Sequence, residues 1–535
     1  WFYRVTEPFF VALTNGYRTT LNGFMRVRWL AIVIMALSGW LIYDIGSGLP
    51  QELAPLEDRS RIRAFSRAPE GATFEYMDAY TNELVKVMME NIPESEGIIS
   101  VTSPGFGAST SVNSAFAFAV LSDPETRERG QTEILNELQP DVARLTGALT
   151  YLSEEQSIGN RRGGLPVQYV LQAPSFEKLK ETLPRFVEKV RQDPTFSFVD
   201  VDLKFNKPEL NIEINRQKAR DLGVSVLDIA QTLQLGLSGQ RFGYFIMNGK
   251  QYQVIGQIQR EGRDEPVDVR SLYVRNESGS MIQLDNLVTF REQTTPPTLY
   301  RFNRFASATV SAGLAGENTI GDGIEAMNAI ADETLGDGFY TTLTGTSRDF
   351  AESSSSLVFA FSLALILIYL VLSAQFESFR DPFIIMFTVP LALAGAVISL
   401  LFFDQTLNIF SQIGIIMLIG LVAKNGILIV EFANQRKEAG LSRLEAIKDA
   451  SVARFRPILM TSLSTILGVL PIALALGAGS ESRVSMGIAV IGGLLFATVL
   501  TLYVIPAIYS YLSSKEAKRS KREAELAEAE METAE

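Results

Sequence analysis

The stretch LIGLVAKNGILIVEFA, from Leu418 to Ala433, decides the class of this protein because it sets one lysine inside a long apolar run. Lys424 is separated from the next charge, Glu431, by uncharged residues only. At roughly 1.5 Å of helix per residue this is about 10 Å, a long reach for a lysine that must extend to a membrane surface. An ammonium in hydrocarbon is costly unless it is paired or hydrated. We therefore favour a functional lysine over one that snorkels.

Lys424 belongs to one of six apolar runs, each near the ~20 residues that a helix needs to cross a lipid bilayer. A buried helix of a soluble protein could explain any single run, but not five of them between residues 353 and 512. The sequence therefore predicts a membrane protein with one span followed, after a long segment, by five more. The runs are 29–48, 353–376, 383–403, 406–433, 457–480 and 484–512.

Composition limits the chemistry that the chain can perform. The 535 residues carry a formal net charge of −12, which argues against nucleic acid as a partner. Histidine and cysteine are both absent, so histidine triads, thiolate nucleophiles and the usual zinc sites are excluded. No phosphate-binding loop, GxSxG or HExxH motif is present. We expect no enzymatic activity, no metal and no cofactor, and proton chemistry must use Asp, Glu, Lys, Tyr or water.

Basic residues near the spans predict the orientation of the chain. Arg26 and Arg28 precede the first span, and the link 436–456 and the tail 513–535 are rich in Lys and Arg. Under the positive-inside rule these parts are cytoplasmic, including the segment 1–28. The long segment 49–350 then lies on the opposite side of the membrane, and the first apolar run has no small-residue cleavage site of a secretory signal.

The outer segment shows the pattern of a globular α+β region. Thr73 and Ser175 are plausible N-caps of amphipathic helices that stand between short strand-like runs. Their alternation predicts two split βαβ modules of the ferredoxin-like type. The first covers residues 49–165, and the second is formed by residues 166–220 together with residues 297–350. Asn248-Gly249 between two strand-like runs predicts a tight hairpin within an inserted β-rich module, 221–296. The strand-like runs begin at Arg61, Ile98, Ala115, Val167, Phe196, Leu210 and Ala306.

A buried lysine needs a carboxylate partner, and the six runs offer none at mid-depth. Asp44 and Asp404 stand at the outer margin and Glu431 near the inner one. Another polypeptide segment is the simplest source of the partner. A Lys–carboxylate pair can exchange protons, because protonation of the carboxylate frees the ammonium. Lys424 therefore indicates ion coupling. Asn425 is adjacent to Lys424. The hydroxyls of Thr461 and Ser462 could take part in the same polar region, or they could only bond to the backbone of their own helix.

In the outer segment, the loop PGFGAST from Pro104 carries one aromatic residue, Phe106, between two strand-like runs. Phe116 and Phe118 alternate on one face of the second run. A turn beside two core phenylalanines is one interpretation. The other is an aromatic pocket with a mobile loop, which suits apolar ligands.

Several long motifs resemble one family. They are GLVAKNGILIVEFANQ from Gly420, RFRPILMTSLSTILGVLPIALALGAGS from Arg454, LPQELAPLEDRSRI from Leu49, PGFG from Pro104 and INRQKARDLGVSVLDI from Ile214. Together they resemble the resistance-nodulation-division exporters, in particular the AcrB-type multidrug branch, over nearly the whole chain.

The resemblance implies the C-terminal half of a twelve-span pump in the inner membrane of a Gram-negative bacterium. Such pumps are homotrimers driven by proton influx, and they export amphiphilic compounds through a periplasmic adaptor and an outer-membrane channel. The implied partners are the N-terminal half of the pump, further copies, adaptor, channel, membrane lipid and amphiphilic small molecules. The outer segment would hold two porter subdomains and one docking subdomain in the periplasm.

The resemblance also assigns roles residue by residue. Lys424, Thr461, Arg454 and the adjacent Asn425 match the proton-relay region, and Phe106 matches the phenylalanine of a switch loop between two pockets. The implied substrate-binding positions are Phe106, Phe116, Phe118, Ile99, Val101 and Tyr151. Two features depart from the family pattern: the paired aspartates of the relay are not in this chain, and Pro104 and Ile99 stand where near relatives place phenylalanine.

Two other functions compete with multidrug export. One is a metal-ion or other small-molecule exporter of the same superfamily, of which metal export is disfavoured because histidine and cysteine are absent. A membrane scaffold or sensor that does not transport is disfavoured by Lys424, since a scaffold gains nothing from a buried charge.

Overall fold

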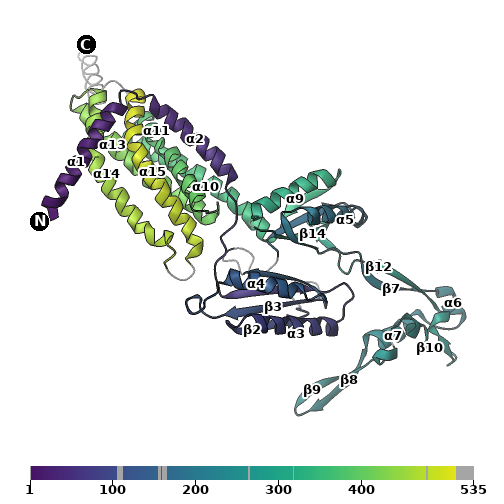
Figure 1. Ribbon diagram of the computed structural model, residues 1–535. Helices are drawn as coiled ribbons and strands as arrows, with labels where there is room; N and C mark the ends of the chain where they lie inside the picture. Colours follow the sequence, from purple (N-terminus) through teal and green to yellow (C-terminus); the bar gives the residue numbers. More distant parts are fainter. Residues whose placement is uncertain are drawn as a thin grey trace.

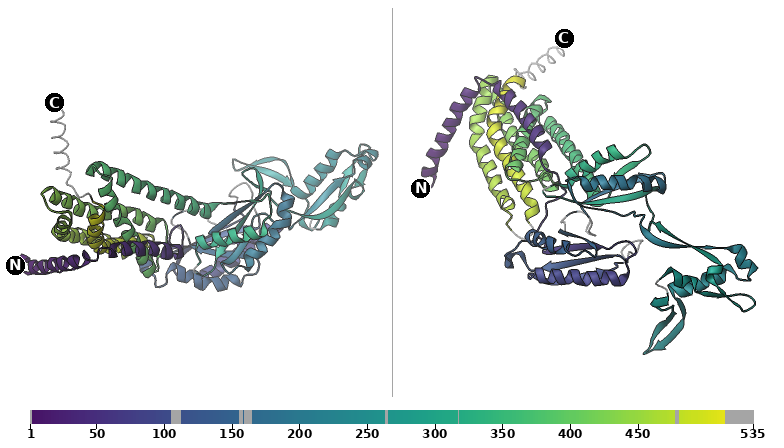
Figure 2. Two further views of the ribbon diagram at one scale, coloured as in Figure 1. Left: turned by 90° about the horizontal axis from the view of Figure 1, so that it is seen from above. Right: turned by 45° about the vertical axis from the view of Figure 1, so that its right-hand side comes forward.

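The structure is a computed structural model that describes residues 2–104, 112–154, 158, 165–262, 265–316, 318–476 and 480–513. A bundle of long helices stands at one end, and β-rich lobes extend from it (Figure 1). The other two views show the same division, with the β8–β9 hairpin projecting away from the bundle (Figure 2).

The predicted number of spans is confirmed by length and composition: six helical segments of the described residues are long and apolar enough to cross a membrane. A further helix, α1 (Phe2–Phe24), precedes them. The six are α2 (Leu30–Gly48), α10 (Gly345–Phe376), the consecutive α11 (Arg380–Met386) and α12 (Thr388–Phe402), α13 (Ile409–Glu438), α14 (Arg443–Ala473) and α15 (Glu481–Leu512).

Several helices extend beyond the apolar runs that predicted them. Helix α14 begins at Arg443, well before the run 457–480, because the Ser442 side chain caps its first turn. It ends at Ala473, before the run does. Helix α10 begins at Gly345, whereas the apolar run begins near residue 353. Hydropathy marks the part of a helix that suits lipid, whereas capping residues and backbone geometry set where the helix ends.

The third span is broken at Phe387, between α11 and α12. Pro390 follows in the first turn of α12. Proline has no N–H, and its ring would crowd the carbonyl of Met386 in a continuous helix. The break therefore has a local cause in the sequence.

Helix α15 lies against α12, α13 and α14 at the centre of the bundle. Glycines allow this close approach. A Cβ on Gly493 would lie 2.9 Å from the Ala392 carbonyl oxygen, and one on Gly492 would lie 3.1 Å from the Gly395 carbonyl oxygen and collide with the Ser399 side chain. The α12–α15 contact therefore depends on residues without side chains.

The first outer sheet is antiparallel, with strand order β2-β3-β1-β4, and its chain order is β-α-β-β-α-β. Ile62 and Ala64 of β1 point to one face, where they pack with Met77 and Leu84 of α3 and Leu138 of α4. The elements are β1 (Arg61–Arg67), α3 (Phe74–Asn91), β2 (Ser95–Thr102), β3 (Ser114–Leu121), α4 (Gln131–Ala143) and β4 (Leu149–Glu154), with a short 3-10 turn at Pro124–Thr126. The predicted N-cap is confirmed: the Thr73 side chain accepts from the Tyr76 amide.

The second outer sheet has five strands in the order β13-β14-β5-β15, with β6 also paired to β14. The predicted N-cap Ser175 is confirmed at the start of α5. The elements are β5 (Val167–Ala173), α5 (Phe176–Gln192), β6 (Phe196–Val201), β13 (Tyr300–Phe302), β14 (Phe305–Leu314), α9 (Ile320–Thr334) and β15 (Tyr340–Leu343). Helix α10 follows β15 directly, so this sheet leads into the bundle.

Between β6 and β13 the chain forms a module of its own. The strand predicted from Leu210 exists as β7 (Lys207–Ile214), but it pairs with β12 (Val288–Thr295) instead of joining the five-stranded sheet. The two strands form a stem that leads outward (Figure 1). The other elements are α6 (Arg216–Asp221), α7 (Val226–Leu233), a π-helical turn at Gln234–Ser238, β8 (Gln240–Met247), β9 (Lys250–Gly256), a 3-10 turn at Arg260–Gly262, α8 (Pro266–Arg270), β10 (Tyr273–Arg275), β11 (Met281–Gln283) and a 3-10 turn at Leu284–Asn286.

The hairpin predicted from Asn248-Gly249 is confirmed. Both residues have positive φ, 53° and 73°, and they join β8 to β9 with Met247 paired to Lys250. A two-residue turn with two positive φ angles matches the twist of the flanking strands.

Candidate functional site

Lys424 lies on an exposed stripe of α13. The exposed residues of this stripe are spaced three, four or seven positions apart, which keeps them on one side of the helix. They are Ile413, Met417, Gly420, Lys424 and Glu431. The other sides of α13 pack against α15, α14, α12 and α10. Among the described residues no carboxylate forms an ion pair with Lys424. This chain thus presents the ammonium outward and does not bury it within its own bundle.

Asn425, next to Lys424, points the opposite way, into the bundle. Its Nδ2 donates to Ser462 Oγ of α14 at 3.3 Å, and Ser462 Oγ also accepts from Thr498 Oγ1 of α15 at 2.9 Å. All three side chains are buried. This contact joins three helices at the depth of Lys424. Thr498 could not be selected from the sequence, since hydroxyl side chains are common in membrane spans.

Thr461 stands at the same depth as Lys424, because its neighbour Ser462 bonds to Asn425. Its Oγ1 donates to the Ile458 carbonyl oxygen of its own helix at 3.1 Å. The hydroxyl thus adopts the self-bonded alternative, and its part in a proton relay stays a prediction.

Arg454 lies about two turns from Thr461 along α14, on the same side of that helix. Its guanidinium carbon is 4.4 Å from the centre of the Phe432 ring, and that of Arg436 is 4.8 Å from the same ring. Arg436 also pairs with Asp449 at 2.8 Å. The structure therefore places Arg454 between α13 and α14, farther from the outer sheets than Lys424. Neither Phe432 nor Arg436 was among the site residues predicted from the sequence.

The outer candidate residues meet on the face of the first sheet that α3 and α4 leave uncovered, which we call the open face. Strand register places Val101, Phe116, Phe65 and Tyr151 in one row across four strands. The next row holds Ile99, Phe118, Arg63 and Ser153. The Phe116 and Phe118 rings stack with centres 6.4 Å apart. Five of the six predicted binding residues are thus gathered on one face. Phe106 lies outside the described residues.

Phe65 and Arg63 complete the open face, and neither was among the site residues predicted from the sequence. Both lie in the run RIRAFSR of β1, whose strict alternation sets residues 61, 63, 65 and 67 on one face and Ile62 and Ala64 on the other. That alternation could have identified them, once β1 was known to pair with β3.

The open face approaches the second sheet at Tyr151. The Tyr151 and Phe198 rings have centres 5.9 Å apart, and Arg67 pairs with Asp200 of β6 at 3.1 Å. Burial raises the pKa of Tyr151 to about 12, so this tyrosine is neutral at physiological pH. Two sheets thus meet beside the aromatic row.

A cavity of about 1320 Å³ lies where both sheets meet the outer ends of α2 and α12. Burial raises the pKa of the Glu52 and Glu154 carboxyls in its wall, although Thr406 and Thr132 donate hydrogen bonds to them. Burial there favours uncharged acids. Its lining includes Leu49, Glu52, Arg63, Tyr151, Ser153, Glu154, Ser197, Leu314, Leu401 and Thr406.

Comparison with known proteins agrees with this arrangement of a helical bundle beneath outer sheets. A model of the AcrB/AcrD/AcrF family matches residues 1–513. The chain belongs to this family of resistance-nodulation-division efflux transporters.

Three curated relatives are each about twice as long as this chain. An uncharacterised transporter of Haemophilus influenzae is 33% identical over 493 residues, which cover 91% of this chain and 47% of the relative. The multidrug resistance protein MdtC of Proteus mirabilis is 29% identical over 504 residues, 93% of this chain and 48% of the relative. MdtC of Edwardsiella ictaluri is 28% identical over 521 residues, 96% of this chain and 50% of the relative. The chain therefore spans about half the length of the relatives it matches.

Proposed function

We propose that this chain forms the C-terminal half of a proton-driven exporter of hydrophobic and amphiphilic compounds. The observation that carries the proposal is Lys424, an ammonium on an exposed stripe of a membrane helix without a carboxylate partner among the described residues. A charge in such a position is functional by default and requires a partner. The N-terminal half of the pump is the source of carboxylates that we propose.

The proposed coupling follows from charge. In the resting state the Lys424 ammonium favours the ionised form of the carboxylates that face it. Proton uptake neutralises a carboxylate, the pair loosens, and α13 shifts relative to the other half. Asn425 holds α13 to α14 and α15 during this shift. Arg454, on the ring of Phe432, assists proton release toward the cytoplasm, and Thr461 supports the relay at the depth of Lys424.

The open face is the wall of the substrate site in this proposal. Its two rows combine flat aromatic rings with one arginine, and such rings bind amphiphilic molecules without a fixed hydrogen-bond pattern. Phe106, which lies in the sequence between β2 and β3, stays a proposed substrate-binding residue on the strength of the family resemblance alone. The multidrug resistance named for two relatives supports this substrate class.

The proposal extends to the assembly. The two outer sheets would be ferredoxin-like porter subdomains in the periplasm, and the module on the β7–β12 stem would be the docking subdomain. The pump would be a homotrimer in the inner membrane, which works with a periplasmic adaptor and an outer-membrane channel.

Reconstitution of the full-length pump tests the function. The pump is placed in liposomes loaded with a hydrophobic fluorescent dye, and a pH gradient is imposed across the membrane. We expect dye transport that follows the gradient and stops when a protonophore collapses it. Transport that is equal with and without the gradient, or no transport under it, contradicts the proposal.

A further inference from the structure

The linker that follows α2 holds the outer end of α13. The Leu407 amide donates to the Pro50 carbonyl oxygen at 2.8 Å, and the Ile409 amide donates to the Leu53 carbonyl oxygen at 3.2 Å. Gln51 and Leu407 pair as in a parallel sheet. We call these two segments, 50–53 and 406–409, the joint. Thr406 Oγ1 adds a bond to the Glu52 carboxylate at 2.5 Å.

The joint is part of the second sheet's hydrophobic core. Leu53 is buried there together with Ile320 of α9, and Ile409, the first residue of α13, packs against the same cluster. The Gly321 amide of α9 donates to the Gln51 carbonyl oxygen at 3.2 Å. A Cβ on Gly321 would lie 3.1 Å from that of Gln51, so the fit is close. The first turn of the Lys424 helix is thus anchored in an outer sheet.

Helix α13 is held to α15 near both of its ends. Asn408 Oδ1 caps its first turn by accepting from the Phe410 amide at 3.0 Å, and it also accepts from Ser485 Oγ of α15 at 3.0 Å. At the other end, Tyr509 Oη of α15 donates to Asn434 Oδ1 at 2.7 Å. These contacts tie α13 to α15 near both ends, and they favour movement of α13 without bending.

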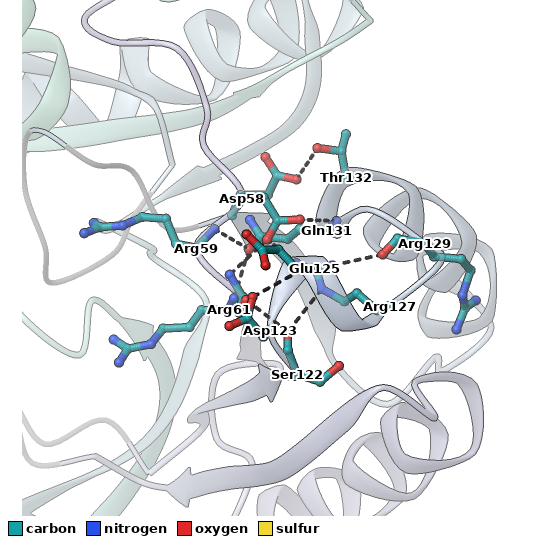
Figure 3. Close-up of polar contacts among 12 residues, drawn as sticks. Asp58, Arg59, Arg61, Ser122, Asp123, Glu125, Arg127, Arg129, Gln131 and Thr132 are labelled. Atoms are coloured by element: carbon teal, nitrogen blue, oxygen red, sulfur yellow. Dashed lines mark hydrogen bonds and ion pairs between the residues drawn. The ribbon is translucent and has the colours of Figure 1, made fainter. Parts of the chain in front are cut away.

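The same linker continues to the first sheet. The Asp58 carboxylate accepts from the Gln131 amide at the start of α4 at 2.9 Å and pairs with Arg127, whose side chain is buried (Figure 3). Gln131 Oε1 accepts from the Arg59 and Arg61 amides at 3.1 and 2.9 Å (Figure 3). A shift of the joint is therefore passed along a short linker to the strand β1 that carries Phe65.

We infer that α13 transmits the movement of Lys424 to the outer sheets directly, through the joint. Lys424 lies about 22 Å along the helix from Ile409, at roughly 1.5 Å per residue. Helix α10 also reaches the second sheet, because it continues from β15 and buries Phe350 in that sheet's core, but these contacts join it to the second sheet and not to the first. The joint touches the second sheet and leads on to the first. This inference rests on the proposed proton coupling and adds the path by which it reaches the substrate face.

The test compares two isoleucines of α13 in the full-length pump, with dye efflux measured under an imposed pH gradient. Ile409→Ala removes packing at the joint, and Ile415→Ala removes the same atoms against the bundle core. We expect Ile409→Ala to lower efflux at least about fivefold, the lower range of an allosteric coupling, with dye binding unchanged. Ile415→Ala should keep efflux within about twofold of wild type.

A disulfide gives a second measurement that does not remove packing. In a full-length pump without other cysteines, Gln51→Cys with Leu407→Cys should form a disulfide whose oxidised form exports as well as the reduced form, because the joint moves as a unit. Loss of export on oxidation, or equal efflux by Ile409→Ala and Ile415→Ala, overturns the inference.

The Lys424→Ala variant is measured in the same efflux assay. If Lys424→Ala is inactive while Ile409→Ala is normal, only the role of the joint is contradicted. If Lys424→Ala exports normally, the proposed function is contradicted, and so is the role of the joint that rests on it.

Discussion

At the scale of single residues, Phe65 stands directly opposite both Phe116 and Tyr151, so it belongs to the same aromatic row. We predict that Phe65→Ala in the full-length pump weakens binding of a large aromatic dye. The loss of one ring contact is worth about 1 kcal/mol, roughly a fivefold change in affinity. Equilibrium dye binding measures it, and export in cells should fall in parallel.

The matched control for this change is Phe205→Ala. Phe205 is also half-buried, but it packs on the core of the second sheet, away from the open face. We expect it to leave dye affinity unchanged. Equal loss of affinity in both variants would show a general effect on folding and contradict the role of Phe65.

The sequence could identify individual residues only where their own neighbours determine them. Lys424 stands out because no other charge lies near it in an apolar run. Phe65 does not, because its role depends on β3 and β4, which pair with β1 across long stretches of chain. The exposure of Lys424 in this chain could not be predicted from the sequence either, since it depends on which helices surround α13.

At the scale of elements, the contact between α12 and α15 depends on Gly492, where a Cβ would collide with Ser399 and approach the Gly395 carbonyl oxygen. We predict that Gly492→Ala destabilises the bundle by about 1–3 kcal/mol, as overpacking does. Thermal unfolding of the detergent-solubilised full-length pump measures it as a lower melting temperature.

Gly468 of α14 provides the control, because a Cβ there would meet no described atom within 4 Å. Gly468→Ala should be neutral or stabilising by up to about 1 kcal/mol, since alanine favours helix. A Gly492→Ala pump that melts at or above the wild-type temperature would show that α12 and α15 are not closely packed.

Elements were predictable where the pattern is local. The hairpin at Asn248-Gly249 and the helix N-caps Thr73 and Ser175 are each determined by residues that are neighbours in the sequence, and the structure contains all three. The partner of β7 was not predictable, because Lys207–Ile214 alternates like a sheet strand and only the distant β12 decides where it pairs. The helix ends that lie beyond the apolar runs were not predicted either, because hydropathy carries no information on capping residues.

At the scale of the whole molecule, the chain lacks a partner for its exposed membrane cation among the described residues, and it covers about half of its relatives. We predict that residues 1–535 expressed alone give no drug resistance in a pump-deficient, drug-sensitive host. Co-expression with the N-terminal half should restore it. Resistance from the single chain, at comparable expression, would show that it is not half of a pump.

The central claim is that Lys424 couples proton uptake to export, and the direct test is dye efflux by Lys424→Ala in vesicles under an imposed pH gradient. Without the ammonium the facing carboxylates should keep their protons to higher pH and hold one conformation. We predict that efflux is abolished while folding and dye binding, measured separately, are retained. Lys424→Arg should also fail because a planar guanidinium does not repack or lose its proton like an ammonium, and Arg454→Ala should be milder. Wild-type efflux by Lys424→Ala would contradict the account and leave Lys424 a lysine that only extends to the membrane surface.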